Sequence, residues 1–191
     1  MEKQNTRDRI LAVASDLFYQ EGIRKVGIKE ICEKAGITKP TLYHHFTSKD
    51  RLIAAYLEDL DRKTSGAMKA AFEKTPGSLQ DKILALFDRI AASADIETWK
   101  GCPFIRAAAE FADNDTHPAP SLSKAHKQNM ETWIAGCLVD GAIDKPAETA
   151  RQLMILLDGA VMAVFLHRNP DYARQSAAVA LAILTKAERK T

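Results

Sequence analysis

Apolar residues recur along this chain at intervals of three and four positions, the spacing that puts them on one face of an α-helix. The first stripe runs from Ile10 to Phe18 and predicts a helix ending near Gln20, with Asn5 or Thr6 as its N-cap. Further stripes predict helices over about 48–73, 78–92, 103–112, 121–138, 146–167 and 171–189. No β-branched run alternates with period two, so we expect an all-α protein.

The stretch Ile28–Phe46 is typical of two short helices joined at a glycine. The apolar stripe of the first helix ends at Ala35, and Gly36 follows where the chain must turn left-handed, a conformation that glycine adopts without a Cβ penalty. Thr38 is then the expected N-cap of the second helix, with Pro40 in its first turn, where a missing N–H loses no intrahelical bond.

This second helix has a buried side and a polar side. Leu42 and Phe46, four residues apart, are expected to face inward. The side chains left pointing mostly outward are Lys39, Thr41, Tyr43 and His44. Such a helix-turn-helix fits the DNA major groove. Many helical corners bind nothing, but Asp50 is the only acidic residue between Lys34 and Arg51, which favours DNA binding.

The segment GITKPTLYHHFTSKDRL, residues 36–52, resembles the recognition region of the tetracycline-repressor (TetR/AcrR) family of bacterial regulators. The likeness extends upstream through Ile10–Phe18 and Gly22, and so covers about the first 60 residues. It implies a helix-turn-helix DNA-binding domain over about 1–48 and a helical effector-binding and dimerisation domain over about 49–191. Family members usually carry Ser or Thr where this chain has Gly27. The side-chain cap of the helix that begins at Ile28, and a phosphate contact from this position, are therefore in doubt.

Carried over by motif, the resemblance implies two kinds of DNA contact. One set should touch bases or adjacent phosphates, and it comprises Thr38, Lys39, Pro40, Thr41, Tyr43 and His44. Lys29 and Lys49 should hold the phosphate backbone, which supplies affinity without sequence information. Lys39 and Pro40 vary in the family, so no base preference is implied.

Assembly is expected to involve the last two helices. Gly159, Ala160 and Ala163 would let a partner backbone approach closely, and Ala177 is a small residue on the final helix. The resemblance implies that these two helices pair with their twofold mates in a four-helix bundle. A homodimer also follows from the DNA argument, because a twofold dimer reads two half-sites. Part of each apolar stripe must still belong to the core within one chain.

A small-molecule site is expected among the middle helices. Its candidate residues are the large, adaptable apolar ones there: Trp99, Phe104, Phe111, Met130, Trp133, Met154, Met162 and Phe165. Arg106, Glu110 and Asp158 are the polar groups expected to orient a ligand. For each of the apolar residues, packing in the core is the alternative to ligand binding. The resemblance implies small, often hydrophobic effectors that lower DNA affinity.

Composition narrows the remaining classes. The 27 basic against 25 acidic residues leave a net charge of +2, so DNA affinity must come from a local patch. His44 and His45 are adjacent and point about 100° apart on a helix, and the other histidines stand alone, so no metal site is expected. No catalytic or cofactor motif occurs, so we expect neither an enzyme nor a cofactor.

The start of the chain is charged rather than typical of a signal peptide, and we identify no apolar run long enough to span a bilayer. We therefore expect no membrane association and a cytoplasmic protein, in which three cysteines without C-x-x-C spacing stay reduced.

The combined expectation is a homodimeric regulator that binds double-stranded DNA and is released from a palindromic operator by a small hydrophobic effector. A first alternative is a regulator without such a ligand, switched by oxidation of Cys102 or by a protein partner. A second alternative is an enzyme on an all-α scaffold.

Overall fold

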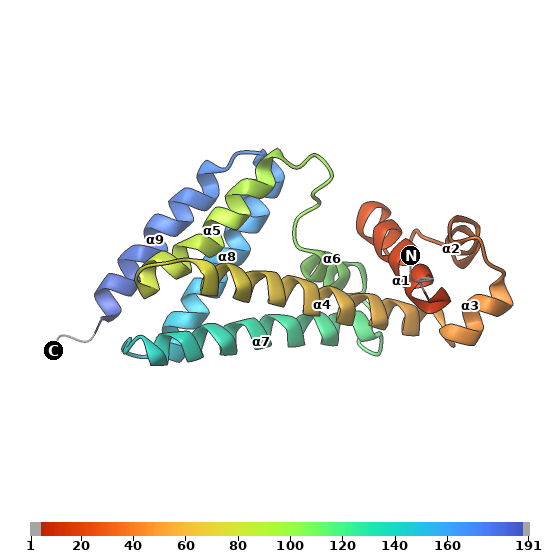
Figure 1. Ribbon diagram of the computed structural model, residues 1–191, viewed down its shortest axis with the longest axis horizontal. Coiled ribbons are helices and arrows are strands. Elements are labelled where there is room, and N and C mark those ends of the chain that lie inside the picture. Colours follow the sequence, from red (N-terminus) through yellow and green to blue (C-terminus); the bar gives the residue numbers. More distant parts are fainter. Residues whose placement is uncertain (1–4, 189–191) are drawn as a thin grey trace. The chain divides into compact units, whose positions relative to one another are not determined.

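The computed structural model describes residues 5–188, and regular structure in that range is helical (Figure 1). Its α-helices are α1 (Thr6–Glu21), α2 (Ile28–Ala35), α3 (Lys39–His45), α4 (Lys49–Lys74), α5 (Leu79–Ala92), α6 (Pro103–Glu110), α7 (Pro118–Asp140), α8 (Pro146–His167) and α9 (Asp171–Ala187). One 3₁₀ turn covers Ser93–Asp95, and one isolated bridge joins Ile143 and Glu188. The all-α fold predicted from the sequence is confirmed.

The chain divides into two compact units. Unit 1 contains the residues up to Arg62 together with Pro103–Ala125, and unit 2 contains Lys63–Cys102 with the residues from His126 onward. Helix α6 thus packs with the N-terminal helices, although the segment Lys63–Cys102, which belongs to unit 2, precedes it. These two units are defined by packing. The boundary expected near residue 48 instead separates a DNA-binding domain from an effector and dimerisation domain, and it stays a prediction.

Unit 1 is built around the three N-terminal helices, which all pack on one another. Their buried side chains are Ile10, Ala14, Leu17, Phe18, Ile31, Cys32, Ala35 and Leu42, and Phe46, directly after α3, is buried as well. The first turn of α1 is capped by Asn5, whose side chain accepts a hydrogen bond from the Arg7 N–H. In the same unit the Phe18 ring meets Tyr56 of α4 edge-on, with 5.5 Å between centroids. These contacts fix the start of α1 and pack α1 against α4.

Helix α7 begins three residues earlier than the sequence pattern predicts. We expected Pro118 and Pro120 to end the preceding helix, but both lie in the first turn of α7. Proline is tolerated there because the first four N–H groups of a helix have no intrahelical acceptor. As a consequence, His117 occupies the position just before the helix.

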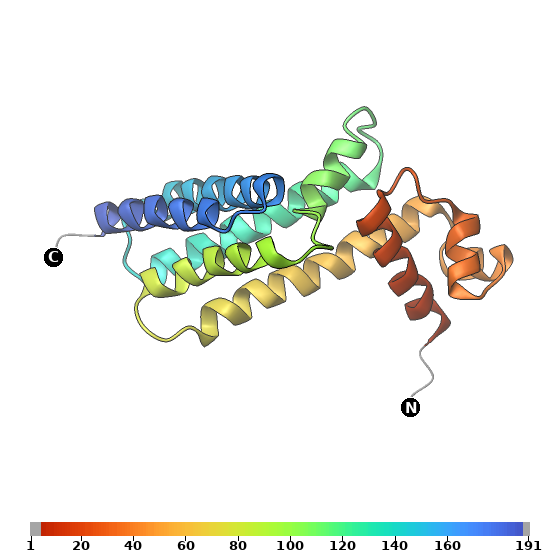
Figure 2. The ribbon, with the colours of Figure 1, turned by 90° about the horizontal axis from the view of Figure 1, so that it is seen from above.

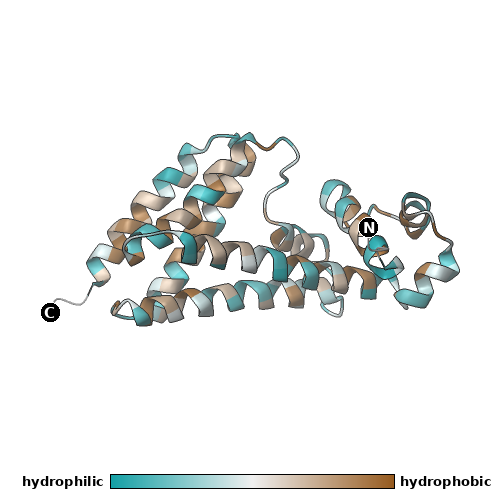
Figure 3. Cartoon of the chain, viewed as in Figure 1, coloured by the Kyte–Doolittle hydropathy of each residue, from teal (hydrophilic) through white to brown (hydrophobic). Residues whose placement is uncertain are grey.

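Unit 2 has a core formed largely by α5, α8 and α9, which lie side by side (Figure 2). Ser78 and Asp81 form a reciprocal capping box that begins α5. The core includes Leu86, Phe87 and Leu157, and brown, hydrophobic bands recur along these helices in Figure 3.

Helix α8 corrects the expectation about membrane-spanning length. With 22 residues and a mean hydropathy of 1.5 in its most apolar stretch, α8 is long and apolar enough to cross a bilayer. The sequence analysis did not identify this apolar stretch because Gln152 and Asp158 interrupt it. Its buried side instead packs against α5 and α9 as a core helix, where Leu153 and Val164 are fully buried.

The small residues predicted at the dimer interface do not share one environment. Ala160 is fully buried within the chain's own core, so it cannot contact a partner. Ala177 is half-buried against that core, and Gly159 is exposed. The opposite side of α8 is apolar and exposed: Ile155, Met162 and Leu166 are 66%, 50% and 70% accessible. At Ala160 the alternative of core packing within one chain is therefore the one observed.

Candidate nucleic-acid interface

The corner between α2 and α3 follows from Gly36. This residue has φ 64° and ψ 41°, the left-handed conformation in which a Cβ would be strained. Its N–H donates to the Glu33 carbonyl at 3.2 Å, and the Ile37 N–H donates to the Cys32 carbonyl at 3.0 Å. This pair of bonds is the Schellman arrangement, which satisfies the last carbonyls of α2. It directs the chain out of α2 and into α3.

Helix α3 begins at a threonine cap. The Thr41 N–H donates to Thr38 Oγ1 at 3.4 Å, and the two threonine hydroxyls lie 2.9 Å apart. By contrast Gly27, in the cap position of α2, makes no side-chain capping bond. Both findings confirm the caps inferred from the sequence.

The two sides of α3 differ as its periodicity predicts. Leu42 and Phe46 are buried, and the Arg7 guanidinium lies over the Phe46 ring at 4.9 Å. Tyr43 is 45% exposed, and Lys39, Pro40 and His44 are exposed as well. Figure 3 shows α3 mostly in the hydrophilic colour. The result is a short helix whose outer face carries the hydrogen-bonding side chains of Lys39, Tyr43 and His44.

The basic residues around α3 differ in their freedom to bind phosphate. Lys29 lies 3.8 Å from Glu33, and 80% of its side chain is exposed. Lys34 pairs with Glu30 at 3.2 Å and with Glu21 at 3.7 Å. The exposed lysines can exchange such loose surface pairs for phosphate contacts, because an exposed pair contributes little free energy.

Lys49 is held inside unit 1. Its ammonium donates to the carbonyl oxygens of Ile23, at 2.8 Å, and of Arg24, at 3.4 Å. Burial lowers the pKa of the Lys49 ammonium, while the charges of Glu110 and Asp50 act in the opposite direction. An ammonium has three donors, so one remains for a phosphate. Its predicted DNA role therefore accompanies a structural one.

The expected effector residues are distributed over both units. Phe104 and Phe111 belong to unit 1, whereas Trp99, Met130, Trp133, Met154, Met162 and Phe165 belong to unit 2. Within unit 2, Met130 and Met154 are buried in the core, and Met162 is half-exposed. The tryptophans take part in two aromatic pairs: Trp99 with Phe165 at 6.3 Å, and Trp133 with Phe72 at 5.3 Å.

The polar residues expected to orient a ligand have partners inside the chain. The Arg106 guanidinium donates to the Tyr19 carbonyl at 2.8 Å, and Glu110 accepts from the Arg24 N–H at 2.8 Å. Asp158 pairs with Lys127 in unit 2. Binding a ligand through any of them would require these contacts to be shared or broken.

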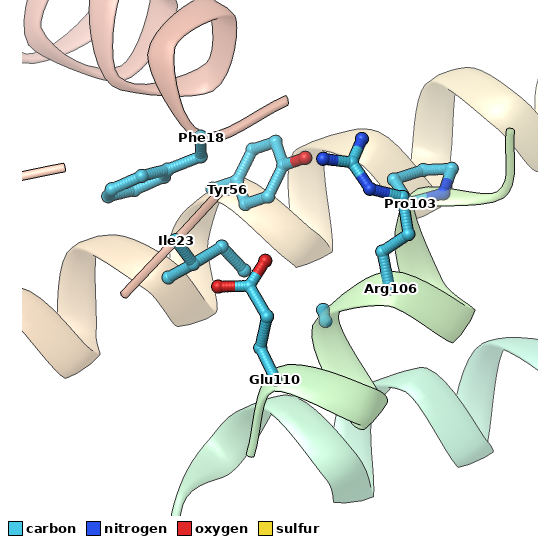
Figure 4. Close-up of a pocket in the computed structure, with 7 residues that line it drawn as sticks. Phe18, Ile23, Tyr56, Pro103, Arg106 and Glu110 are labelled. Atoms are coloured by element: carbon cyan, nitrogen blue, oxygen red, sulfur yellow. The ribbon is translucent and has the colours of Figure 1, made fainter. Parts of the chain in front are cut away.

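Arg106 and Glu110 line a small cavity inside unit 1, with Phe18, Ile23, Tyr56, Pro103 and Ala107 (Figure 4). In Figure 4 the Tyr56 hydroxyl points toward the Arg106 guanidinium. The cavity offers about 10 Å³, enough for about one water molecule. It is too small for an organic effector.

Sequence reasoning missed two residues that connect α6 and the segment after it to the rest of unit 1. Arg24 contacts three residues at the end of α6: its N–H bonds Glu110, its guanidinium pairs with Asp113, and it lies 5.0 Å over the Phe111 ring. His117 is buried beside Asp50. The only sequence signal was a histidine directly before Pro118, the position of an N-cap.

Comparison with known proteins identifies the N-terminal region. Residues 10–56 match the model of the family described as bacterial regulatory proteins, tetR family. The HTH-type transcriptional regulator UidR of Escherichia coli (strain K12) is 45% identical over 62 residues, which are 32% of each chain. The matched stretch therefore spans about a third of that relative's length.

Two further similarities cover most of the chain. The HTH-type transcriptional repressor KstR2 of Rhodococcus jostii (strain RHA1) is 26% identical over 179 residues, 87% of this chain and 81% of KstR2. The crystal structure of SCO4454, a TetR-family transcriptional regulator from Streptomyces coelicolor, superimposes with a TM-score of 0.84. It is 31% identical and covers 96% of both chains.

Proposed function

The chain belongs to the TetR family of DNA-binding transcriptional regulators, and on this premise we propose that it is a homodimeric repressor released from its operator by a small hydrophobic effector. The family resemblance inferred from residues 36–52 is thereby confirmed. As a transcription regulator the protein is not an enzyme. We further propose that it acts in the cytoplasm, where the DNA is.

The observation that carries the proposal is the division of α3 into a buried and a polar side. Leu42 anchors the helix in unit 1, so the outward direction of Tyr43 and His44 is set before DNA arrives. A preorganised polar helix can bond base edges without first losing conformational entropy. We propose that Thr38, Lys39, Pro40, Thr41, Tyr43 and His44 contact bases or nearby phosphates, with Lys29 and Lys49 on the backbone.

Dimerisation is proposed through the exposed side of α8 and α9. Six of the nine large hydrophobic side chains that are exposed in the described part of the chain lie on these helices: Ile155, Met162, Leu166, Tyr172, Val179 and Leu181. Along α8, Ile155, Gly159, Met162 and Leu166 follow the spacing of one helical stripe. An apolar face of this kind is typical of an interface between subunits.

We propose residues 1–48 as the DNA-binding domain and 49–191 as the effector and dimerisation domain. In the second domain the half-buried pairs Trp99–Phe165 and Trp133–Phe72 are the aromatic groups best suited to yield to an apolar ligand, because neither is fully enclosed. Repression rather than activation is supported by the long alignment with KstR2, a repressor.

Selection of binding sites from a random-sequence DNA library tests the proposal. Wild-type protein should enrich a palindromic duplex, and two protomers should bind each duplex in sedimentation. A protein that retained no duplex at low salt, or that enriched a site without twofold symmetry, would contradict the proposed mode of binding. Transcription from a promoter that carries the selected site should fall when the protein is added.

A further inference from the structure

His117 lies at a corner where three segments of unit 1 meet. The segment 111–117 connects α6 to α7, and we call it the α6–α7 corner. His117 is 6% exposed, and its imidazole stacks on Phe111 with 3.6 Å between ring centroids and 2° between ring planes. Its Nε2 faces the Asp50 carboxylate in the first turn of α4, at 3.5 Å. His117 therefore joins this corner to the helix that follows the recognition helix.

The imidazole also caps α7. The Ala119 N–H donates to His117 Nδ1 at 3.1 Å, inside the protein. Pro118, the first residue of α7, has no N–H, so this bond satisfies the first donor of the helix. Nδ1 accepts a hydrogen bond and cannot carry a hydrogen, so the neutral ring carries its hydrogen on Nε2. This nitrogen lies 3.5 Å from the Asp50 carboxylate and makes no hydrogen bond within the described part of the chain.

A proton on this histidine would undo the cap. In the imidazolium both nitrogens are donors, so Nδ1–H would oppose the Ala119 N–H. The positive charge would also lie at the positive end of the α7 dipole. Asp50 can compensate only in part, because 62% of its side chain is exposed to water.

The charged groups around His117 mostly oppose protonation. Burial lowers the pKa of the His117 imidazole; the neighbouring Asp50 raises it, and the positive charges of Arg24 and Lys49 lower it again. Arg24 is itself held by Asp113 and Glu110 at the end of α6, and Lys49 by backbone carbonyls of the loop after α1. The neutral ring is thus the form that this geometry accommodates.

We propose that His117 is a proton-operated cap: the neutral ring holds the α6–α7 corner on the first turn of α4, and protonation releases the corner and weakens DNA binding. The DNA part rests on the proposed function. Asp50 is only five residues beyond His45, the last residue of α3. Release of the corner therefore loosens the segment that orients the recognition helix.

The sign of the effect follows from the two states. Unfolded chains bind a proton at His117 near the ordinary value of about 6.5, whereas the folded chain binds it only at lower pH. The unfolded state therefore takes up more protons as the pH falls below about 6.5, and the folded state loses stability there. The stabilisation of the folded state by neutral His117 is therefore complete above about pH 6.5. It is lost once the pH falls below the pKa of His117 in the folded state.

His117→Asn is the matched variant, because Asn Oδ1 can replace Nδ1 as the acceptor for Ala119 and does not titrate. On going from about pH 7.5 to about pH 5.5, the wild-type melting temperature should fall by about 2–4 °C more than that of H117N, as expected for the loss of one cap. If the melting temperatures of the two proteins depended equally on pH, the proposed role of His117 as a proton-operated cap would be wrong.

Nuclear magnetic resonance of ring-labelled histidine tests the wild type directly, whatever the stability of H117N. The resonances of His117 should show the Nε2–H tautomer and a pKa lowered from the ordinary value. Asp50→Asn should move that titration further down, because it removes the charge that raises this pKa. An Nδ1–H tautomer, or a His117 pKa at or above the ordinary value, would also contradict the proposed cap.

The DNA part is measured with a duplex selected by wild-type protein at neutral pH. At constant salt, acidification over the same range should weaken wild-type binding by about fivefold per protomer more than H117N binding, the equilibrium equivalent of one cap. His44 and His45 remain in both proteins and cancel in the comparison. An equal acid response would refute the coupling to DNA while leaving the cap intact. If no duplex is selected at all, the coupling fails with the proposed function, and melting and resonance data still decide the cap.

Discussion

Leu42 and Tyr43 are adjacent in the chain but lie in opposite environments, the first fully buried and the second 45% exposed. One residue of an α-helix rotates the side-chain direction by about 100°, which is enough to move it from core to solvent. A buried anchor beside an exposed aromatic hydrogen-bonding group suits recognition, since the anchor fixes the direction of its neighbour. This contrast makes Tyr43 the best single test of the recognition face.

Tyr43→Ala should weaken binding to the selected duplex by about 1–3 kcal/mol, because it removes a base or phosphate contact. Its melting temperature and dimerisation should stay as in the wild type, since the side chain packs on the outside. Tyr43→Phe keeps the ring and removes only the hydroxyl, so it separates the contributions of these two groups to DNA affinity. The affinity of both variants is measured by fluorescence anisotropy with labelled DNA. Wild-type affinity in Tyr43→Ala would show that the recognition face lies elsewhere.

Lys49 is expected to have both a structural and a DNA-binding effect. Lys49→Ala should reduce the salt dependence of DNA binding by about 1 per contact, so by about 2 for a twofold dimer, and should affect all sequences alike. It should also lower the free energy of unfolding by about 1–3 kcal/mol, because the carbonyls of Ile23 and Arg24 lose their donor.

Lys29→Ala is the control for this pair of effects. Lys29 is exposed and makes only a loose pair with Glu33, so its removal should change the salt slope and leave stability unaltered. If Lys49→Ala lowers stability but keeps the wild-type salt slope, Lys49 serves only to hold the loop after α1.

At the scale of elements, α8 shows how one helix can serve two surfaces. Its buried side contains Leu153 and Val164 and belongs to the core of unit 2, while Ile155 and Leu166 are about two-thirds exposed. A helix that is apolar nearly all round must cover both sides, and a second copy of the chain can cover the exposed one. The proposed dimer would account for the composition of α8, which is long and apolar enough to cross a bilayer.

Met162→Arg should place a charge in the centre of the exposed stripe of α8 and yield a folded monomer, because burying an unpaired charge disfavours association. Sedimentation velocity measures the change in mass, and operator binding should be lost with the dimer. Val139→Arg is the matched control, since Val139 is 61% exposed on α7, outside this stripe, and should leave the dimer intact. A dimeric Met162→Arg protein would exclude this face as the interface.

At the scale of the whole molecule, effector binding should be detected by the two tryptophans. Trp99 and Trp133 both belong to unit 2 and both pack against aromatic partners, so an apolar ligand inserted there should alter their emission. The melting temperature should rise with ligand concentration. Screening hydrophobic and planar aromatic compounds should find at least one that does both and releases DNA.

Effector binding and DNA binding are thermodynamically linked, so each must change the affinity for the other. A ligand that favours the released state must bind less tightly when DNA is present, by the same factor by which it weakens DNA binding. A compound that bound equally well with and without DNA would occupy a cavity without acting as an effector. Release by oxidation of Cys102 alone, with no coupled ligand, would replace this mechanism with a redox switch. The pKa of the Cys32 and Cys137 thiols is raised chiefly by burial, which leaves those two less reactive.

The sequence by itself determined the features that depend on neighbouring residues. The caps at Asn5 and Thr38, the left-handed Gly36 and the buried Leu42 are all found as predicted, because periodicity and backbone dihedral preference act within a few residues. The same local rules identified the α2–α3 corner, and the resemblance of residues 36–52 to known regulators indicated the family. They failed at Pro118, where the residue that stops one helix can equally begin the next.

Only the tertiary structure decided which groups meet across long separations in sequence. Glu110 contacts Arg24 across 86 residues, His117 reaches Asp50, and the Lys49 ammonium bonds the loop after α1. No periodicity specifies such pairs, because each depends on how separate segments of unit 1 pack together. The same holds for Ala160 and Met162, two positions apart on one apolar helix: packing against α5 and α9 buries the first and leaves the second half-exposed.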